Sequence, residues 1–234
     1  MDLRDGVASV IQHLDDVRVS GTVTLHYLVA DATGAAATIE FLEGRPVVHT
    51  GAALTVPVLA NDTYASSLSW MRSRGQGGDQ GAGARNSGSL SRFARAADML
   101  EPRRQGSAPL VPAAFEILAE VAQGPATQWS IVYDMPRREV HFRTSAHQPV
   151  RTLALSRFDL ACGGPVMMLP DVNGALSGDV TGHFVSWTHE ANLKLITGAY
   201  GKVSFLKDSP RQEIESVAAQ PLNSACAPSK PAEK

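Results

Sequence analysis

The sequence has few cysteines, no excess of either charge and no long apolar run. Cysteine occurs only at positions 162 and 226 of the 234 residues, and neither cysteine belongs to a CxxC pair or a Cys/His cluster with zinc-site spacing. No apolar run approaches the about 18 residues that a membrane span needs. Lys and Arg number 21 against 23 Asp and Glu, so neither a nucleic acid nor an anionic membrane is indicated as a partner.

The cysteines and the first residues give little further information. Cys162 lies in LACGGP before a turn, where a small buried thiol is the ordinary interpretation. A disulfide between Cys162 and Cys226 is neither indicated nor excluded. The opening residues MDLRDG carry no export signal, which leaves the compartment open, the periplasm included for the complete protein.

Self-contained catalytic motifs are also absent. The sequence has no usable GxSxG, HExxH, GxxxxGK[ST] or GxGxxG pattern. None of its seven histidines pairs with another at the i, i+4 helical spacing of a zinc site. His26 in LHYLVAD and His141 in VHFR occupy alternating strand positions, where a structural role is the ordinary interpretation. Any function must therefore be argued from other residues.

What the sequence does have is a globular composition with clear periodicity. Its 44% hydrophobic content is enough to bury a core. Apolar spacing predicts a helix that begins almost at Met1 and runs to Leu14. Alternating apolar residues and turns then predict antiparallel strands in residues 22–31, 36–44, 45–51 and 56–61. Helices are expected in residues 62–72, 91–100 and 109–123, and a second meander in residues 128–134, 139–144 and 150–155, followed by a short helix from Ser209.

A glycine-rich segment interrupts this order. Residues 73–89 hold six glycines and no aliphatic side chain larger than alanine, too little to offset the entropy of ordering. We expect residues 73–90 to form a mobile loop within a single domain of residues 1–220, and residues 221–234 to form a flexible tail. The order of elements predicts an α+β fold with helices packed on antiparallel sheets.

Several blocks of the sequence resemble the choloylglycine hydrolase family, which includes bile salt hydrolases and penicillin V acylases. LHYLVAD, TIEFLEGRPVVHTG, VPVLANDTY, the glycine-rich loop and SRFARAADML occur in the family's order and in similar wording. QWSIVYDMPRREVHFRT is similar to the family's later paired strands. The resemblance covers roughly residues 1–210 and is closest to Gram-negative members. It implies the four-layer αββα fold of the N-terminal nucleophile hydrolases, present here in incomplete form.

The resemblance assigns roles to two polar residues that flank the glycine-rich loop. Asn61 in VLANDTY matches a family asparagine whose side-chain N–H can donate to a developing oxyanion. Arg92 in SRF matches a family arginine that arranges the site electrostatically. Judged without the resemblance, Asn61 would be a turn or cap residue and Arg92 a solvated basic residue. Tyr64 and Trp70 are candidates for acyl contact, although core packing explains both equally well.

The family's nucleophile, an amino-terminal cysteine, has no counterpart in this sequence. Removal of Met1 would expose Asp2, which offers no thiol or hydroxyl, and cleavage before Thr22 would discard a matched helix. We therefore expect the nucleophile to lie outside this chain, which alone should be inactive. The resemblance implies hydrolysis of an acylated small molecule such as a conjugated bile acid, penicillin V or an acyl-homoserine lactone. We expect no cofactor and no metal, and a homo-oligomer for the complete protein.

Two alternatives stay open. The chain could belong to a non-catalytic binding or assembly protein that kept the later layers of the fold, or a separate chain could supply the nucleophile. Because part of the family's fold is missing from this chain, we expect the strands that this part would cover or pair to present unpaired edges and an apolar face. Expressed alone, the chain should then aggregate or recruit a partner.

Overall fold

The computed structural model describes residues 6–16, 25–74, 88–104, 109–161 and 163–223. These residues form two compact units, divided between Arg137 and Arg138. That residues 1–220 form one domain stays a prediction. The expected loop at 73–90 falls largely, and the expected tail at 221–234 mostly, outside the described residues.

The first unit combines a three-stranded sheet with helices. Its strands are β1 (His26–Ala30), β2 (Ala36–Leu42), β3 (Arg45–Thr50) and a later strand, β4 (Trp129–Asp134). Its helices are α1 (Val7–Gln12), α2 (Tyr64–Arg74), α3 (Ser89–Arg104) and α4 (Leu110–Glu120), with short 3-10 turns at Leu14–Asp16, Gly51–Ala53 and Gly124–Ala126. The predicted early helix is confirmed from Val7 to Gln12 and is followed by a 3-10 turn that begins at Leu14, and residues 1–5 lie outside the described part.

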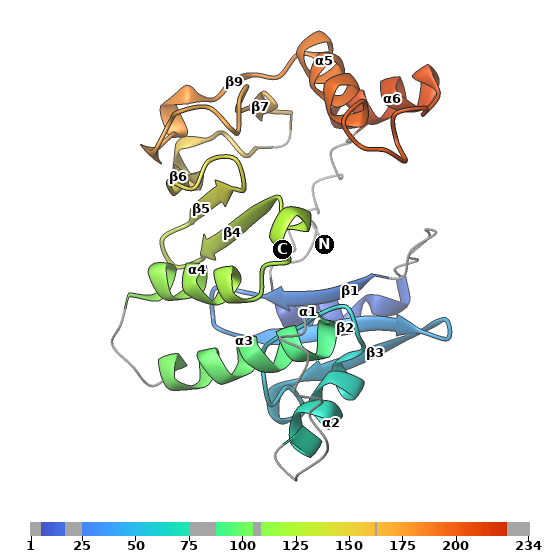
Figure 1. Cartoon of the computed structure of the whole chain (residues 1–234), viewed down its shortest axis with the longest axis vertical. Coiled ribbons are helices and arrows are strands. Elements are labelled where there is room, and N and C mark those ends of the chain that lie inside the picture. The colour runs from blue at the N-terminus through green and yellow to red at the C-terminus, as the bar shows by residue number, and fades with distance from the viewer. Residues whose placement is uncertain (1–5, 17–24, 75–87, 105–108, 162, 224–234) are drawn as a thin grey trace, which may run out of the picture. The chain divides into compact units, whose positions relative to one another are not determined.

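β2 is the central strand of this sheet and is buried on both faces. β1, β2 and β3 lie side by side in that order, as Figure 1 shows, and both pairings are antiparallel. Ala37 and Ile39 are buried on one face, and Thr38 and Glu40 on the other. The face that carries Thr38 and Glu40 therefore places polar groups inside the unit, which requires partners for them.

Residues 56–61, predicted as a fourth strand, form no strand. Pro57 has no N–H to donate to a ladder. The backbone N–H of Val58 donates to the carbonyl of Val56 at 2.8 Å, and the N–H of Val56 donates to the Tyr64 hydroxyl at 3.1 Å. The segment is an irregular connection. Its backbone N–H groups donate to a carbonyl of the same segment and to the Tyr64 hydroxyl of α2.

The second unit has short strands followed by two helices. Its elements are β5 (Glu139–Thr144), β6 (Arg151–Ala154), β7 (Met167–Met168), β8 (Gly178–Asp179), β9 (Val185–Ser186), α5 (His189–Tyr200) and α6 (Arg211–Ala218), with 3-10 turns at Leu155–Arg157, Thr181–His183 and Gln220–Asn223. β5 pairs antiparallel with β6, β6 pairs parallel with β8, and β7 pairs antiparallel with β9.

The two helices of this unit contact each other through a side-chain hydrogen bond. Asn192 of α5 donates its side-chain N–H to the carbonyl of Ala218, the last residue of α6, at 2.8 Å. α5 begins after Thr188, whose hydroxyl accepts the N–H of Ala191. None of the helices in the described part of the chain combines the length and apolar character that a membrane crossing needs.

Candidate functional site

Asn61 and Arg92, the two residues singled out in the sequence, contact each other in the first unit. Asn61 is exposed in the turn that leads into α2, and Arg92 is half-buried in the first turn of α3. The Arg92 Nη2 atom donates to the Asn61 Oδ1 atom at 3.3 Å, across 31 positions of sequence. The fold thus brings together two residues that the glycine-rich segment separates in the chain.

This contact fixes which way the Asn61 amide points. A guanidinium has five N–H donors and no acceptor, so the atom that Arg92 contacts must be the amide oxygen of Asn61. The Nδ2 group then points away from Arg92, on an exposed side chain. The pair accordingly presents an N–H donor beside a positive charge, which is an arrangement suited to a negatively charged oxygen.

A second link joins the same two segments. The backbone N–H of Asp62, next to Asn61, donates to the Ser89 Oγ atom at 2.7 Å. Ser89 is the first residue of α3 and lies one helical turn before Arg92. The two hydrogen bonds together hold the turn at Asn61 against the start of α3.

A buried carboxylate supports this turn from inside the unit. The N–H of Tyr64, the first residue of α2, lies 3.0 Å from Glu40 Oε1 and 3.2 Å from Oε2. The His26 Nδ1 atom lies 2.7 Å from Glu40 Oε1, which is within ion-pair distance, although His26 Nδ1 forms no hydrogen bond. A carboxylate at a helix start meets the positive end of the helix dipole, so Glu40 stabilises α2 three residues after Asn61.

Tyr64 belongs to the core. Its side chain is fully buried. Its ring lies 4.6 Å from that of His49 and 6.0 Å from that of Phe93, measured between ring centroids. Because its hydroxyl also accepts the N–H of Val56, Tyr64 packs the interior and holds the segment before Asn61. Of the two roles considered for Tyr64, acyl contact and core packing, the structure supports core packing.

Glu40 and Ser89 were not predicted from the sequence to take part in this site. The signal for Glu40 was present, since it is the only charged residue in the strand segment AATIEFL and a lone carboxylate at a buried strand position requires a partner. Ser89 gave no comparable signal because its partner, the N–H of Asp62, lies 27 positions away. His26, predicted to be structural, lies beside Glu40.

No protein-family model and no curated protein sequence matches the chain. Solved structures do match it. Penicillin V acylase from Agrobacterium tumefaciens superposes with a TM-score of 0.64 at 22% identity, over 78% of this chain and 63% of that one. Two variants of conjugated bile acid hydrolase from Clostridium perfringens give TM-scores of 0.54 and 0.53 at 15% identity, each over 78% of this chain and 62% of the other.

These similarities confirm the predicted fold. The chain shares the mixed α+β fold of these penicillin V acylase and bile acid hydrolase structures, as the resemblance to choloylglycine hydrolases implied. It spans about 63% of the length of the penicillin V acylase that it matches.

Proposed function

We propose that the complete protein hydrolyses a linear carbon–nitrogen amide bond in an acylated small molecule. The observation that supports this proposal most directly is the Arg92–Asn61 contact, which engages the amide oxygen of Asn61 and leaves the Nδ2 group of this exposed residue as a donor. The shared fold adds support, because the solved structures that match the chain are named as an acylase and a bile acid hydrolase.

In the proposed reaction, the thiolate of an amino-terminal cysteine attacks the amide carbonyl and forms a tetrahedral intermediate. The Asn61 Nδ2 group donates to the oxyanion of this intermediate, a contribution of about 3 kcal/mol. The amino group of the same cysteine passes the thiol proton to the departing amine, which leaves an acyl-enzyme. Water then attacks the thioester and releases the acid. Arg92 holds the Asn61 oxygen and adds positive potential.

We propose further that the nucleophile lies outside these 234 residues. The two cysteines of the sequence occupy positions 162 and 226, and an N-terminal nucleophile needs a free α-amine on the cysteine itself. The chain alone should therefore not turn over an amide. Penicillin V and conjugated bile acids are the first substrates to test, followed by acyl-homoserine lactones.

The proposal is tested in two steps. The 234-residue chain and a form extended upstream in the reading frame are assayed for release of acid from the three amides. We expect turnover only from the extended form, and turnover by the short chain would contradict the external nucleophile. If the extended form binds a substrate without cleaving it, the binding-protein alternative replaces the proposal.

Asn61→Ala in the active form tests the assigned site. Loss of one oxyanion donor should lower kcat by about 100- to 1,000-fold with a much smaller change in KM. Asn223→Ala is the matched control, since Asn223 is exposed in the second unit, and it should leave kcat unchanged. An Asn61→Ala enzyme with wild-type kcat would remove Asn61 from the mechanism.

A further inference from the structure

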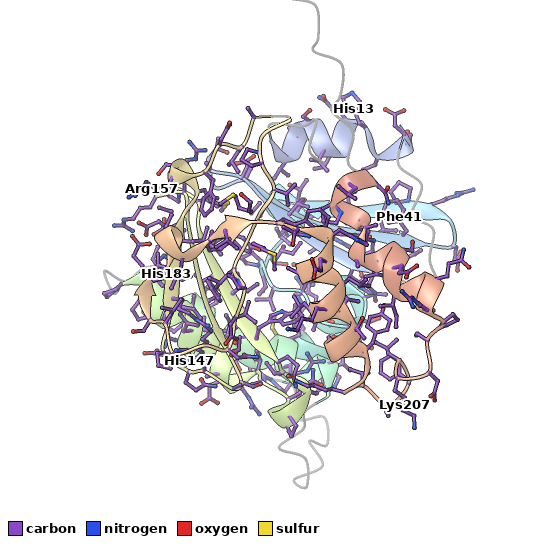
Figure 2. The ribbon with its side chains drawn as sticks, turned by 90° about the horizontal axis from the view of Figure 1, so that it is seen from above. His13, Phe41, His147, Arg157, His183 and Lys207 are labelled. Atoms are coloured by element: carbon purple, nitrogen blue, oxygen red, sulfur yellow. The ribbon has the colours of Figure 1, made fainter. Side chains whose placement is uncertain are left out.

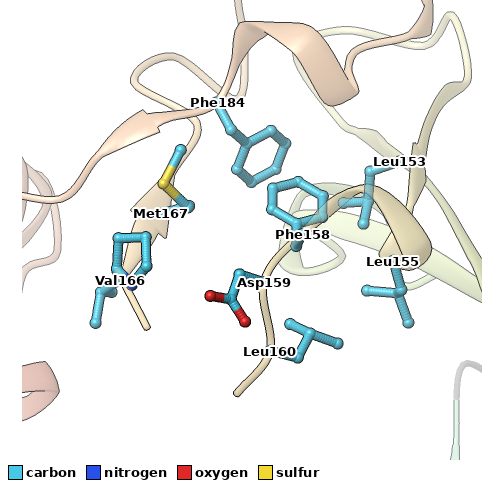
Figure 3. A pocket seen from close by; sticks show the side chains of 9 residues that line it. Leu153, Leu155, Phe158, Asp159, Leu160, Val166, Met167 and Phe184 are labelled. Atoms are coloured by element: carbon cyan, nitrogen blue, oxygen red, sulfur yellow. The ribbon is translucent and has the colours of Figure 1, made fainter. Parts of the chain in front are cut away.

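A hollow in the second unit is lined by neither Asn61 nor Arg92, the two residues that the proposed amide hydrolysis uses. It has a volume of about 300 Å³ and lies between the segment that follows β6 and the residues around β7 and β9. Figure 3 shows it from close by. Nine residues line it: Leu153, Leu155, Phe158, Asp159, Leu160, Pro165, Val166, Met167 and Phe184. All of them belong to the second unit.

The walls of the hollow are apolar and partly exposed. Eight of its nine lining residues are apolar. The rings of Phe158 and Phe184 meet edge to face, with centroids 5.0 Å apart. Leu160 is 63% exposed and Val166 is 47% exposed, so the apolar lining reaches the surface. Concave apolar surface with few polar groups is typical of small-molecule sites.

The single charged lining residue is Asp159. Its carboxylate lies among the side chains of Phe158, Leu160, Val166 and Met167 in Figure 3. The Oδ1 atom accepts the N–H of Ala161 at 2.9 Å, which holds the carboxylate in place. Within the described part of the chain, no basic residue lines the hollow.

The nearest basic residue along the chain acts on another carboxylate. Arg157, labelled with His183 in Figure 2, contributes with His183 to a lowered pKa of Asp179, after the larger effect of hydrogen bonds from Thr181. Arg157 itself does not line the hollow. This leaves the hollow with a negative charge at an apolar wall, which complements a ligand that is apolar at one end and cationic at the other.

We propose that this hollow binds a small organic cation, with an ammonium group at Asp159 and an aryl group against Phe158 and Phe184. A dry cavity of about 150 Å³ accepts benzene, so about 300 Å³ accommodates one ring with a short aminoalkyl chain. The ammonium meets the carboxylate and the negative faces of the aromatic rings, while the aryl group is removed from water.

Three probes of similar shape test the charge requirement: 2-phenylethylammonium, 3-phenylpropionate and the neutral 2-phenylethanol. Each is titrated into the 234-residue chain labelled with ¹³C at the methionine methyl groups, and the Met167 signal is assigned with Met167→Leu. We expect the cation to shift the Met167 signal at the lowest ligand concentration and the anion at the highest. The difference between these two concentrations should shrink as salt is added. Equal affinities for cation and anion, or no shift at Met167, would overturn the proposal.

Asp159→Asn tests the role of the carboxylate. Asparagine keeps an oxygen that can accept the Ala161 N–H and removes only the charge, so the variant should weaken the cation at least about threefold and leave 2-phenylethanol binding unchanged. Asp208→Asn, at another exposed acid of the same unit, should change neither. Undiminished cation binding by Asp159→Asn contradicts the proposal. If that variant does not fold, the comparison of cation and anion on the unsubstituted chain decides it.

Discussion

Glu40 joins the sheet of the first unit to the turn that carries Asn61. It is 1% exposed, and its two oxygens share the N–H of Tyr64 while Oε1 also meets His26. Burying a carboxyl group costs free energy unless its contacts offset the hydration that it loses. Its role is to position α2, and through α2 the residue Asn61.

Glu40→Leu should destabilise the chain by about 2 kcal/mol, because the Tyr64 N–H would be left buried without an acceptor. Urea unfolding measures the loss. Glu116→Gln is the control, since Glu116 forms an ion pair with Arg103 at the surface, and pairs of that kind contribute about 0–1 kcal/mol. Equal stability of the Glu40 and Glu116 variants would show that Glu40 does not support α2.

At the scale of elements, two local features determine where segments begin and turn. The first is Asp31, which directly follows β1 and accepts the N–H of Val7, the first residue of α1, at 3.0 Å. The Thr33 hydroxyl, followed by the Val7 N–H, holds the pKa of Asp31 below its ordinary value of 3.8. Asp31 thereby ties the start of α1 to the end of β1.

Asp31→Asn should lower stability at neutral pH and lose its effect in acid. Because the pKa of Asp31 is lower in the folded chain, the carboxylate contributes stability above its ordinary pKa, and this contribution is lost as the pH falls through the folded value. Unfolding midpoints measured from neutral pH to below about pH 4 should therefore converge for the variant and the original chain. Asp16→Asn, at an exposed acid, should show no such convergence. A difference independent of pH would contradict this account.

The second local feature is the turn between β2 and β3. Its two residues, Glu43 and Gly44, have φ angles of 51° and 76°, as a two-residue hairpin turn with a right-handed twist requires. Glycine adopts positive φ without cost, whereas a residue such as glutamate pays about 1–2 kcal/mol.

Glu43→Asn should raise stability by about 0.5 kcal/mol, because asparagine tolerates positive φ better than glutamate. Gly44→Ala should lower it by about 1 kcal/mol. Thermal unfolding of both variants measures the two shifts. Shifts of the same sign would show that the turn adopts another conformation in solution.

At the scale of the whole molecule, β4 carries an exposed apolar face. Alternate residues of this strand are exposed, with Trp129 at 68%, Ile131 at 39% and Tyr133 at 65%. Side chains at alternate positions share one face of a strand. An exposed aromatic face of this kind favours association.

Trp129→Ser combined with Tyr133→Ser should reduce self-association of the chain by removing most of this apolar surface. Sedimentation velocity over a range of concentrations measures the change. Leu110→Ser is the matched control, because Leu110 is 71% exposed at the start of α4, away from this face in sequence. An original chain that stays monomeric at every concentration would contradict the prediction.

The sequence predicted most elements of the first unit and fewer of the second. Alternation of apolar residues is a local signal, and it located β1, β2 and β3 because each strand is flanked by turn residues. It failed at residues 56–61, where Pro57 and the Tyr64 hydroxyl override a strand-like pattern. It also gave no prediction for α5, although Thr188, which caps that helix, was a usable signal.

The sequence by itself determined the α+β class and the first meander, because periodicity is a property of neighbouring residues. The resemblance of its blocks to choloylglycine hydrolases singled out Asn61 and Arg92. Only the tertiary structure decided how that pair meets, since the Nη2–Oδ1 contact joins residues 31 positions apart. The same holds for Glu40, whose partner Tyr64 lies 24 positions away, and for the hollow at Asp159. Contacts of this kind depend on how elements pack, which no local pattern records.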